Sequence, residues 1–424
     1  MDFSESTLLI TGASGFLGTA LVHRVLLEFH AKKIFVVCRG GSSRLYQVWD
    51  KNLSPSISHL LRFSSRIHVL DGDIEKPHLG LSQQDLDLVR SEAQIFVHCA
   101  SSIALRSRLA RLMSPIVHAT AQLAELALSS PLFKQFVYVS TAFVNSHLHD
   151  PAEATAPLIR EEIYALNASD DPIETATDEL ERCNKMGRVL EAEAFPFAYG
   201  YAKHLTERIL TILFEGCPEK LTIIRPSIIG PAERHPYPGY EVAGKAPLTT
   251  LAAGLILEPG RSFRVASPFL DPMTDSFVDE VPVDVVVNRI IAYLLLRKSG
   301  IFHAVTGLAN TPTFGSVWQE VVRHRVLPWT LRIKWQRVDW HSKSLHAFAQ
   351  IYVVLGTALG FDDSRSHAIW STMSDEMRRK LPLFTTRKQA EIHLRKPAIQ
   401  ENVAMLLRLK NYPPWIIQCL SSIF

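Results

Sequence analysis

Short apolar runs alternate with longer amphipathic segments through about the first 140 residues of the chain. The runs are "TLLI", "KIFVVC", "RIHVL", "QIFVH" and "QFVYV", and a further one, "KLTIIRPSIIGP", spans residues 220–231. Such continuous apolar runs are typical of strands buried on both faces, and the segments between them have the period of helices. The pattern therefore predicts an α/β fold with a Rossmann-type, doubly wound parallel sheet.

This alternation stops near residue 310. Residues 232–282 are rich in proline and glycine and follow the last predicted strands, where loops often cover a substrate. The sequence after residue 310 predicts mostly helices and is rich in aromatic residues. We therefore predict one domain over residues 1–310, with lid elements at about 232–282, and a second, mostly helical domain over 311–424.

Three other stretches of the sequence allow less specific predictions. The acidic residues 150–190 predict a helical, solvated insertion. The apolar stretch 347–361 is shorter than the roughly 20 residues that a membrane span needs, so it predicts a buried helix. The terminal "YPPWIIQCLSSIF" is apolar enough to dock on lipid, although chain termini also pack against their own domain. Peripheral membrane contact therefore stays open.

Charge and composition narrow the classes of function. A formal net charge of +3 gives no reason to expect a nucleic-acid partner. Five scattered cysteines without a CxxC pair favour a reducing compartment, the cytoplasm, over a disulfide framework. The seventeen histidines lack an HExxH-type spacing, so we expect no catalytic metal.

A glycine-rich turn follows the first predicted strand and opens the first predicted helix. Gly12, Gly15 and Gly18 recur every three residues in "TGASGFLG". Glycines in this position allow a tight turn and the close approach of a pyrophosphate, which the helix N-terminus also favours. The predicted dinucleotide contacts here are Thr11, Gly12, Ser14, Gly15, Phe16, Leu17 and Gly18.

The end of the second predicted strand bears on the choice of cofactor. An NAD-binding chain usually places Asp or Glu there, but this sequence continues with Arg39 and has no carboxylate until Asp50. Arg39 and Arg44 are suited to a ribose 2′-phosphate, since guanidinium groups bind phosphate well. The alternative is a solvated loop. We expect NADPH.

In a parallel sheet the ligand lies at the carboxyl ends of the strands. Thr141 ends the fifth predicted strand, so its hydroxyl is expected to face that crevice. The third and fourth strands end in residues that should border the cofactor, namely Asp73, Ile74, Cys99, Ala100 and Ser101.

Tyr199 and Lys203 stand four residues apart in "YGYAK", ahead of the amphipathic run "HLTERILTILF". Residues four apart on a helix share one face. An ammonium there is expected to lower the pKa of the phenol from its ordinary value of about 10, so that the phenol donates a proton near neutral pH. Taken alone, the pattern is also that of a chance pair on a surface helix.

Together these motifs, in this order, resemble the extended short-chain dehydrogenase/reductase family. "GDIEKPHLGLSQQDLDLV", "VHCAS", "YVSTAFVN", "YGYAKHLTERIL" and "IIRPSIIGP" resemble more narrowly the fatty acyl-CoA reductases and the thioester-reductase domains of carboxylic acid reductases and peptide synthetases. The resemblance covers residues 7–310 well, and the rest only loosely.

The resemblance implies a catalytic triad of Thr141, Tyr199 and Lys203, in which Lys203 also contacts the cofactor ribose. It implies an NADP-specific arginine at Arg39. It further implies cofactor contacts after the sixth strand at Pro226, Ser227 and Ile229.

One position departs from the family pattern. Extended members often carry Asn in an N-V-x-G-T motif after the fourth strand, and here "IVHAT" places Ile116 there. If that Asn organises a proton-relay water, this chain needs another route for proton transfer.

Several residues nearby have two interpretations. Arg106, Arg108 and Arg111 are suited to the phosphates of coenzyme A or a carrier, or form a solvated basic face. His235 and Tyr237 line the acyl site or have a structural role, and Arg225 is expected to shape its loop rather than react.

The resemblance implies NADPH-dependent reduction of an acyl thioester, supplied by coenzyme A or an acyl carrier protein, to an aldehyde or, with a second hydride, an alcohol. The alternatives are another activity of the same fold, such as a sugar-nucleotide epimerase or a hydroxysteroid-type dehydrogenase, and a catalytically silent NADP-binding regulator. Acyl chain length and oligomeric state stay open.

Overall fold

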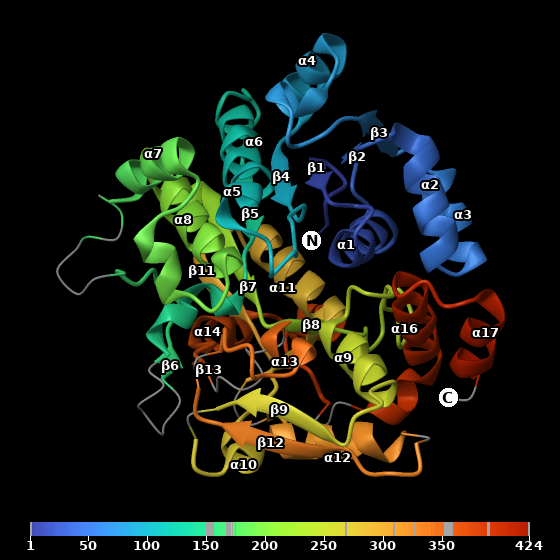
Figure 1. The fold of residues 1–424 in the computed structure, drawn as a ribbon. Helices are drawn as coiled ribbons and strands as arrows, with labels where there is room; N and C mark the ends of the chain where they lie inside the picture. The colour runs from blue at the N-terminus through green and yellow to red at the C-terminus, as the bar shows by residue number, and fades with distance from the viewer. Residues whose placement is uncertain are drawn as a thin grey trace.

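The computed structural model describes residues 2–149, 157–166, 171, 173, 175–267, 269–307, 310–325, 327–338, 340–351, 359–387 and 391–422. Its main element is a parallel sheet of seven strands in the order β11-β7-β5-β4-β1-β2-β3 (Figure 1). The strands are β1 (Thr7–Thr11), β2 (Lys33–Cys38), β3 (Ile67–Asp71), β4 (Ile95–His98), β5 (Gln135–Val139), β7 (Leu221–Pro226) and β11 (Gly300–Ala304). The order reverses between β1 and β4, which confirms the predicted doubly wound sheet.

Helices cover both faces of this sheet. Leu8 and Ile10 of β1 pack into one core layer and Leu9 into the other, because successive side chains of a strand point to opposite faces. The first layer holds α1 (Phe16–Leu27), α2 (Gly41–Asn52), α3 (Pro55–Arg62) and α11 (Val283–Leu295). The second holds α4 (Gln83–Glu92), α6 (Ala119–Leu128) and part of α8 (Ala198–Leu213). Short 3-10 segments are η1 (Pro77–Gly80), η5 (Pro218–Lys220) and η8 (Ile392–Arg395).

A second body of smaller elements lies below the sheet in Figure 1. Three short parallel strand pairs belong to it: β8 (Ile228–Gly230) with β10 (Glu280–Pro282), β9 (Ser262–Ala266) with β12 (Arg332–Gln336), and β6 (Leu158–Ile159) with β13 (Gly360–Phe361). Its helices are α9 (Pro247–Ile256), α10 (Pro272–Asp275), α12 (Phe314–Arg323), α13 (Ala347–Ile351), α16 (Lys396–Leu409) and α17 (Pro414–Ser422).

The segment beyond residue 310 packs with earlier parts of the chain in both bodies. Residues after α14 (Ser364–Thr372) and α15 (Asp375–Lys380), such as Leu381 and Leu383, join the core layer of α1 and α11. Strands β12 and β13 each pair with a strand that precedes residue 310. The domain boundary at residue 310 stays a prediction. In the structure, residues that follow it contact residues that precede it.

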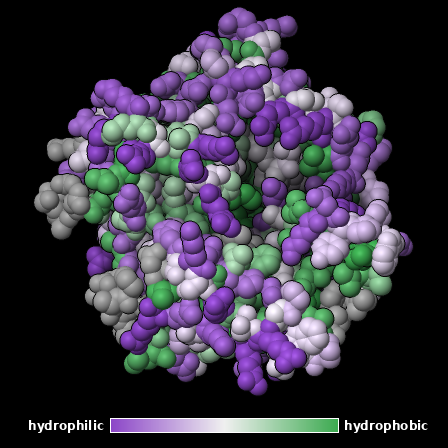
Figure 2. Space-filling view, viewed as in Figure 1, coloured by the Kyte–Doolittle hydropathy of each residue, from purple (hydrophilic) through white to green (hydrophobic). Residues whose placement is uncertain are grey.

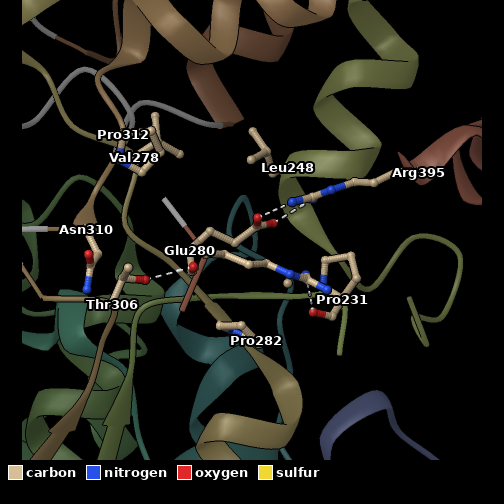
Figure 3. A pocket seen from close by; sticks show the side chains of 11 residues that line it. Pro231, Leu248, Val278, Glu280, Pro282, Thr306, Asn310, Pro312 and Arg395 are labelled. Atoms are coloured by element: carbon tan, nitrogen blue, oxygen red, sulfur yellow. Dashed lines mark hydrogen bonds and ion pairs between the residues drawn. The ribbon is translucent and has the colours of Figure 1, made fainter. Parts of the chain in front are cut away.

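A buried ion pair fixes this segment beside strand β10. The Arg395 guanidinium donates to Glu280 at 2.9 Å, and Thr306 donates to the Glu280 carbonyl at 2.8 Å (Figure 3). Arg387 donates to the carbonyls of Pro231 and Ala232. The cavity between these groups measures about 20 Å³, room for little more than one water molecule, so it is too small for a substrate.

Two expectations about flanking stretches need correction. Within the acidic stretch 150–190, residues 150–156, 167–170, 172 and 174 lie outside the described part, Leu158–Ile159 form β6, and Ala176–Met186 form helix α7. This helix is not simply solvated, because Glu179 is only 2 % exposed and pairs with Arg208 at 2.6 Å. The apolar stretch 347–361 begins as α13 and ends in strand β13 rather than forming one helix, and residues 352–358 lie outside the described part. No helix within the described ranges is long and apolar enough to cross a bilayer.

Candidate active site

The glycine turn between β1 and α1 has no room for side chains. Gly12 has φ +79°, and a Cβ atom there would lie 2.7 Å from the backbone nitrogen of Ala100. A Cβ atom on Gly18 would lie 2.2 Å from the Gly12 carbonyl oxygen. Both distances are far below van der Waals contact, so this close approach of turn, helix and strand β4 requires glycine at both positions.

The start of α1 is built to receive an anion. Gly15 is its N-cap, and the helix has neither a side-chain cap nor an acidic residue in its first turn among the described residues. The N–H groups of a helix's first turn and its dipole favour a negative group. Figure 2 shows the surface hollowed near the middle of this face, where α1 and the segment after β4 lie in Figure 1. The turn therefore fits the pyrophosphate of a dinucleotide.

Arg39 and Arg44 lie together where β2 leads into α2. The side chain of Arg39 is 58 % exposed and stands 3.9 Å from Glu75, a distance at which an exposed ion pair contributes little. Arg44 donates to the Arg39 carbonyl at 3.4 Å. Gly40, with φ +76°, caps α2 without a side-chain hydrogen bond. Two exposed guanidinium groups thus flank a helix N-terminus at the sheet's carboxyl edge.

The ends of β1 and β4 are tied by a buried histidine. His98 accepts or donates through Nδ1 to the Thr11 hydroxyl at 2.7 Å, and the Ala100 N–H donates to the same hydroxyl at 3.3 Å. The Thr11 side chain is therefore occupied within the protein. Asp73, Ile74, Cys99, Ala100 and Ser101 remain partly exposed at the strand ends. Their contacts with a cofactor stay predictions.

Thr141 lies two residues beyond the end of β5. It caps the 3-10 segment η3 (Ala142–Leu148), and its hydroxyl accepts from the Phe143 N–H at 3.3 Å. The residue is 7 % exposed. The neighbouring Ser140 hydroxyl is buried without a hydrogen-bond partner in the described part of the chain. Two hydroxyls are thus held at the carboxyl end of a central strand.

Helix α8 brings Lys203 and Tyr199 to the same strand end. The Lys203 ammonium donates to the Val139 carbonyl, two residues before Thr141, at 2.9 Å. It lies 4.6 Å from the ring centre of Tyr138 and 6.0 Å from that of Tyr199. The structure therefore gathers the predicted Thr141, Tyr199 and Lys203 around the end of β5.

The protonation of this pair differs from the sequence-based expectation. Burial lowers the pKa of Lys203 to about 7, and nearby Glu207 offsets this only in part. Burial raises the pKa of Tyr199 above its ordinary value, whereas the sequence predicted a lowered pKa. The prediction was wrong because loss of solvent outweighs an ammonium 6.0 Å from the ring. Tyr199 is consequently a neutral phenol that holds its proton.

Glu207, one turn beyond Lys203, is a buried carboxylate on which the sequence analysis made no prediction. It is fully buried and forms an ion pair with Arg225 of β7 at 2.5 Å. Arg225 is thus bonded within the protein, and its expected role in shaping its loop stays a prediction. The spacing of Tyr199, Lys203 and Glu207 at every fourth residue was the available signal, since it puts all three on one helix face.

The residues that follow Arg225 are held in place by burial and by a hydrogen bond within the protein. Ser227 is buried, and its hydroxyl donates to Asp279 at 2.5 Å. Pro226 is also buried and Ile229 is partly exposed. Their predicted cofactor contacts stay predictions, with the Ser227 side chain already bonded within the protein.

The departure at Ile116 lies in a π-helical turn. Helix α5 (Leu109–Leu112) runs into the π-helix η2 (Met113–His118), where Ile116 is 1 % exposed. Its carbonyl accepts from the Thr120 hydroxyl, which also contacts His98 Nε2 at 3.0 Å. An apolar side chain thus occupies the position of the family Asn, and its carbonyl is engaged by Thr120.

The structure places His235 and Tyr237 away from this site. His235 Nδ1 lies 3.1 Å from Glu28, which ends α1, and the Tyr237 hydroxyl donates to the carbonyl of Asn52, which ends α2. These contacts are at the far ends of helices α1 and α2, not at their first turns. These contacts support the interpretation that both residues have a structural role, in which they fasten the 232–240 loop to these helices, and the acyl-site interpretation stays untested.

A family model described as male sterility protein, an NAD-binding family, matches residues 10–290. The chain belongs to this family. The match spans the glycine turn, the three residues gathered at the end of β5, and β7 with Arg225, so it covers the whole candidate site.

The chain is similar to several fatty acyl-CoA reductases. It is 28% identical over 325 residues to fatty acyl-CoA reductase 2 of Mus musculus, covering 73% of this chain and 59% of that protein. It is 26% identical over 335 residues to fatty acyl-CoA reductase 1 of Homo sapiens, covering 76% and 61%. The chain thus spans about 60% of the length of these relatives.

Solved structures share the fold. The terminal R domain of the myxalamid PKS-NRPS biosynthetic pathway superimposes with a TM-score of 0.60 at 18% identity, covering 96% of this chain and 92% of that one. UDP-glucuronic acid 4-epimerase from Bacillus cereus, in complex with NAD, gives 0.55 at 13% identity, covering 94% and 99%. At these identities the likeness concerns the fold.

Proposed function

We propose that this protein reduces an acyl thioester, bound to coenzyme A or to a carrier protein, with NADPH as the reductant. The product is an aldehyde, or an alcohol where a second reduction follows. The observation that carries the proposal is the gathering of Thr141, Tyr199 and Lys203 at the end of β5, on the same edge as the glycine turn. Similarity to fatty acyl-CoA reductases supports the thioester as substrate.

The chemistry assigned to the protein's own residues follows from their protonation. Bound NADPH would supply a hydride to the thioester carbonyl carbon. Tyr199, whose raised pKa keeps the phenol neutral, would donate its proton to the carbonyl oxygen as negative charge develops there. Thr141 would donate a second hydrogen bond to that oxygen. Collapse of the resulting hemithioacetal expels the thiol and leaves the aldehyde.

Lys203 would hold the cofactor rather than the substrate. Its ammonium donates to the Val139 carbonyl and has no carboxylate within ion-pair distance among the described residues, so it retains donors for ribose hydroxyls. Arg39 and Arg44 would bind the 2′-phosphate, which supports NADPH over NADH.

The test is product analysis with the whole chain. The purified protein is incubated with NADPH and a panel of acyl-CoA and carrier-bound acyl thioesters. NADPH consumption is followed optically, and products are identified by mass spectrometry. Aldehyde or alcohol formed in proportion to NADPH consumed supports the proposal. NADPH oxidation without acyl product, or no consumption with any thioester, would reject it.

A further inference from the structure

A buried histidine connects the glycine turn with the helices beside Tyr199. His98, the last residue of β4, is 1 % exposed, and its two side-chain partners, Thr11 and Thr120, are also buried. Burial, and to a lesser degree the charge of Lys203, lower the pKa of His98 to about 3. The imidazole is therefore neutral, and the proposed reaction assigns it no role.

The hydrogen bonds around His98 run in one direction. The Ile116 carbonyl can only accept, so the Thr120 hydroxyl donates to it. That hydroxyl must then accept from His98 Nε2, 3.0 Å away, which leaves Nδ1 of the neutral ring to accept from the Thr11 hydroxyl at 2.7 Å. The Thr11 oxygen accepts in turn from the Ala100 N–H at 3.3 Å. The chain of bonds thus fixes the His98 tautomer, with its proton on Nε2.

One end of this chain of bonds lies at the glycine turn. Thr11 directly precedes Gly12, and a Cβ atom on Gly12 would lie 2.7 Å from the Ala100 nitrogen. The Ala100 N–H therefore lies directly against the turn that fits a pyrophosphate. A dinucleotide bound in the turn would restrict the motion of both Thr11 and Ala100.

The other end lies in the π-helical turn η2. Such turns are rare and occur frequently at functional sites. Ile116 of η2 belongs to one apolar cluster with Tyr201 and Leu205 of α8, and Tyr199 packs against the same cluster. In Figure 1, α5 and α6, the helices on either side of η2, lie between strand β4 and helix α8. The turn thus packs against the part of α8 that carries Tyr199.

The His98 ring also contacts the aromatic ring beside Lys203. Its centre lies 6.0 Å from that of Tyr138 in a stacked arrangement, and the Lys203 ammonium lies 4.6 Å from the centre of the same Tyr138 ring. Coupling between sites is carried by contiguous packing and hydrogen bonds of this kind. His98 thus links the glycine turn, η2 and the surroundings of Lys203.

We propose that His98 is a positioning residue that couples the dinucleotide site to the helix face of Tyr199. Occupation of the glycine turn orders Thr11 and Ala100, the hydrogen bonds through His98 extend this order to η2, and η2 then holds Tyr199 in place. The inference rests on the dinucleotide site and is independent of which substrate the protein reduces.

Amide hydrogen exchange, followed by mass spectrometry with and without saturating NADP⁺ and, in parallel, NAD⁺, tests this coupling. His98→Phe keeps an aromatic ring against Tyr138 but lacks both ring nitrogens, and Thr120→Val removes the hydroxyl at nearly constant volume. Thr120→Ser restores the hydroxyl. Ser130→Ala is the matched control, because its buried hydroxyl also donates to a carbonyl four residues back, that of Leu126, but beyond the far end of α6.

In the unaltered protein the cofactor that binds should slow exchange in the glycine turn and, by at least about tenfold, in residues 113–120. His98→Phe and Thr120→Val should keep the first effect and lose most of the second, whereas Thr120→Ser and Ser130→Ala should keep both. If His98→Phe does not fold, Thr120→Val and Thr120→Ser decide the question.

The same cofactor-induced slowing of residues 113–120 in all the proteins would overturn the proposal, since His98 would then have only a structural role. Slowing confined to the glycine turn of the unaltered protein would also overturn it, as would an equal loss in Ser130→Ala. These readouts need no turnover, so failure of the proposed reductase activity is distinguished from failure of the coupling.

Discussion

Two parts of helix α8 bury charge in different ways. In the turn around Glu207 and Arg208, each charged group has an opposite partner at hydrogen-bond distance, Arg225 for the first and Glu179 for the second. One turn earlier, Lys203 is equally buried, but it donates to a backbone carbonyl and lies against aromatic rings, and the nearby Glu207 is paired with Arg225 instead. Its pKa is lowered to about 7 as a consequence.

This difference separates a structural role from a functional one on a single helix. A buried ion pair with saturated hydrogen bonds holds two elements in place, and removing one partner leaves a buried charge. A buried ammonium without a counter-charge is unfavourable for the fold and persists where a ligand or reaction uses it. Tyr199 and Lys203 thus lie in the part of α8 that is not optimised for stability.

The largest effect is expected from Tyr199→Phe. The change removes one hydroxyl and keeps the ring, so the proton donor is lost while packing is retained. Turnover of an acyl thioester should fall by roughly 10²–10⁴, the usual share of a positioned acid. Cofactor affinity, measured by fluorescence, and thermal stability should stay near those of the unaltered protein. Unimpaired turnover would show that the Tyr–Lys spacing is a coincidence.

Glu207→Gln tests the turn of α8 that contains Glu207 and Arg208. The amide leaves Arg225 fully buried without its negative partner, so the free energy of unfolding should fall by about 3–5 kcal/mol. Glu181→Gln in α7 is the control, because its ion pair with Lys185 is exposed and contributes little. Chemical unfolding measures both. Equal stability of the two variants would contradict the view that the ion-paired turn of α8 has a structural role.

Lys203→Met should change how stability depends on pH. Because the folded pKa is about 7 and the unfolded value about 10.5, the unfolded chain holds one more proton between these pH values. The unaltered protein should therefore gain stability as pH rises through this window, by at most about 1.4 kcal/mol per pH unit from this group, and the variant should lack that gain. NADPH binding should weaken in the variant.

Lys185→Met, an exposed lysine of α7, is the control for this comparison. Unfolding is measured without cofactor at several pH values from 6 to 10. Identical pH profiles for Lys203→Met and the unaltered protein would contradict the lowered pKa of Lys203.

Arg39→Ala should have the smallest effect. We expect NADPH to be preferred over NADH by at least tenfold, about 1.4 kcal/mol, and the variant to lose much of that ratio by binding NADPH more weakly. The affinity for NADH should not change. Equal use of both cofactors by the unaltered protein would remove Arg39 as the basis of cofactor choice.

The sheet and the site around it were predictable because their signals are local. Buried parallel strands are continuous apolar runs, and the glycine turn lies between strand and helix in the sequence itself. The sequence predicted Thr141 from its position at a strand end. It predicted Tyr199 and Lys203 from their shared helix face. The structure places Lys203 against Val139 at the end of β5 and 6.0 Å from the Tyr199 ring centre, and the catalytic roles of the three residues stay predictions.

The errors concern properties that depend on distant partners. Glu179 looked like part of a solvated acidic segment, because nothing in the local sequence shows that Arg208 buries it. For His235 and Tyr237 the sequence allowed two roles, and only the structure shows their contacts with Glu28 and Asn52. The pKa of Tyr199 was predicted in the wrong direction because spacing gives proximity but not the degree of burial.

The proposed reaction is tested most directly by the fate of the transferred hydride. The protein is incubated with an acyl-CoA and NADPH deuterated at the transferred position of the nicotinamide ring, and the product is analysed by mass spectrometry. The account predicts one deuterium at C1 of the aldehyde, or two at C1 of an alcohol, and almost no labelled product from Tyr199→Phe. Acyl product without deuterium, or label that appears only in water, would contradict hydride transfer to the thioester carbonyl.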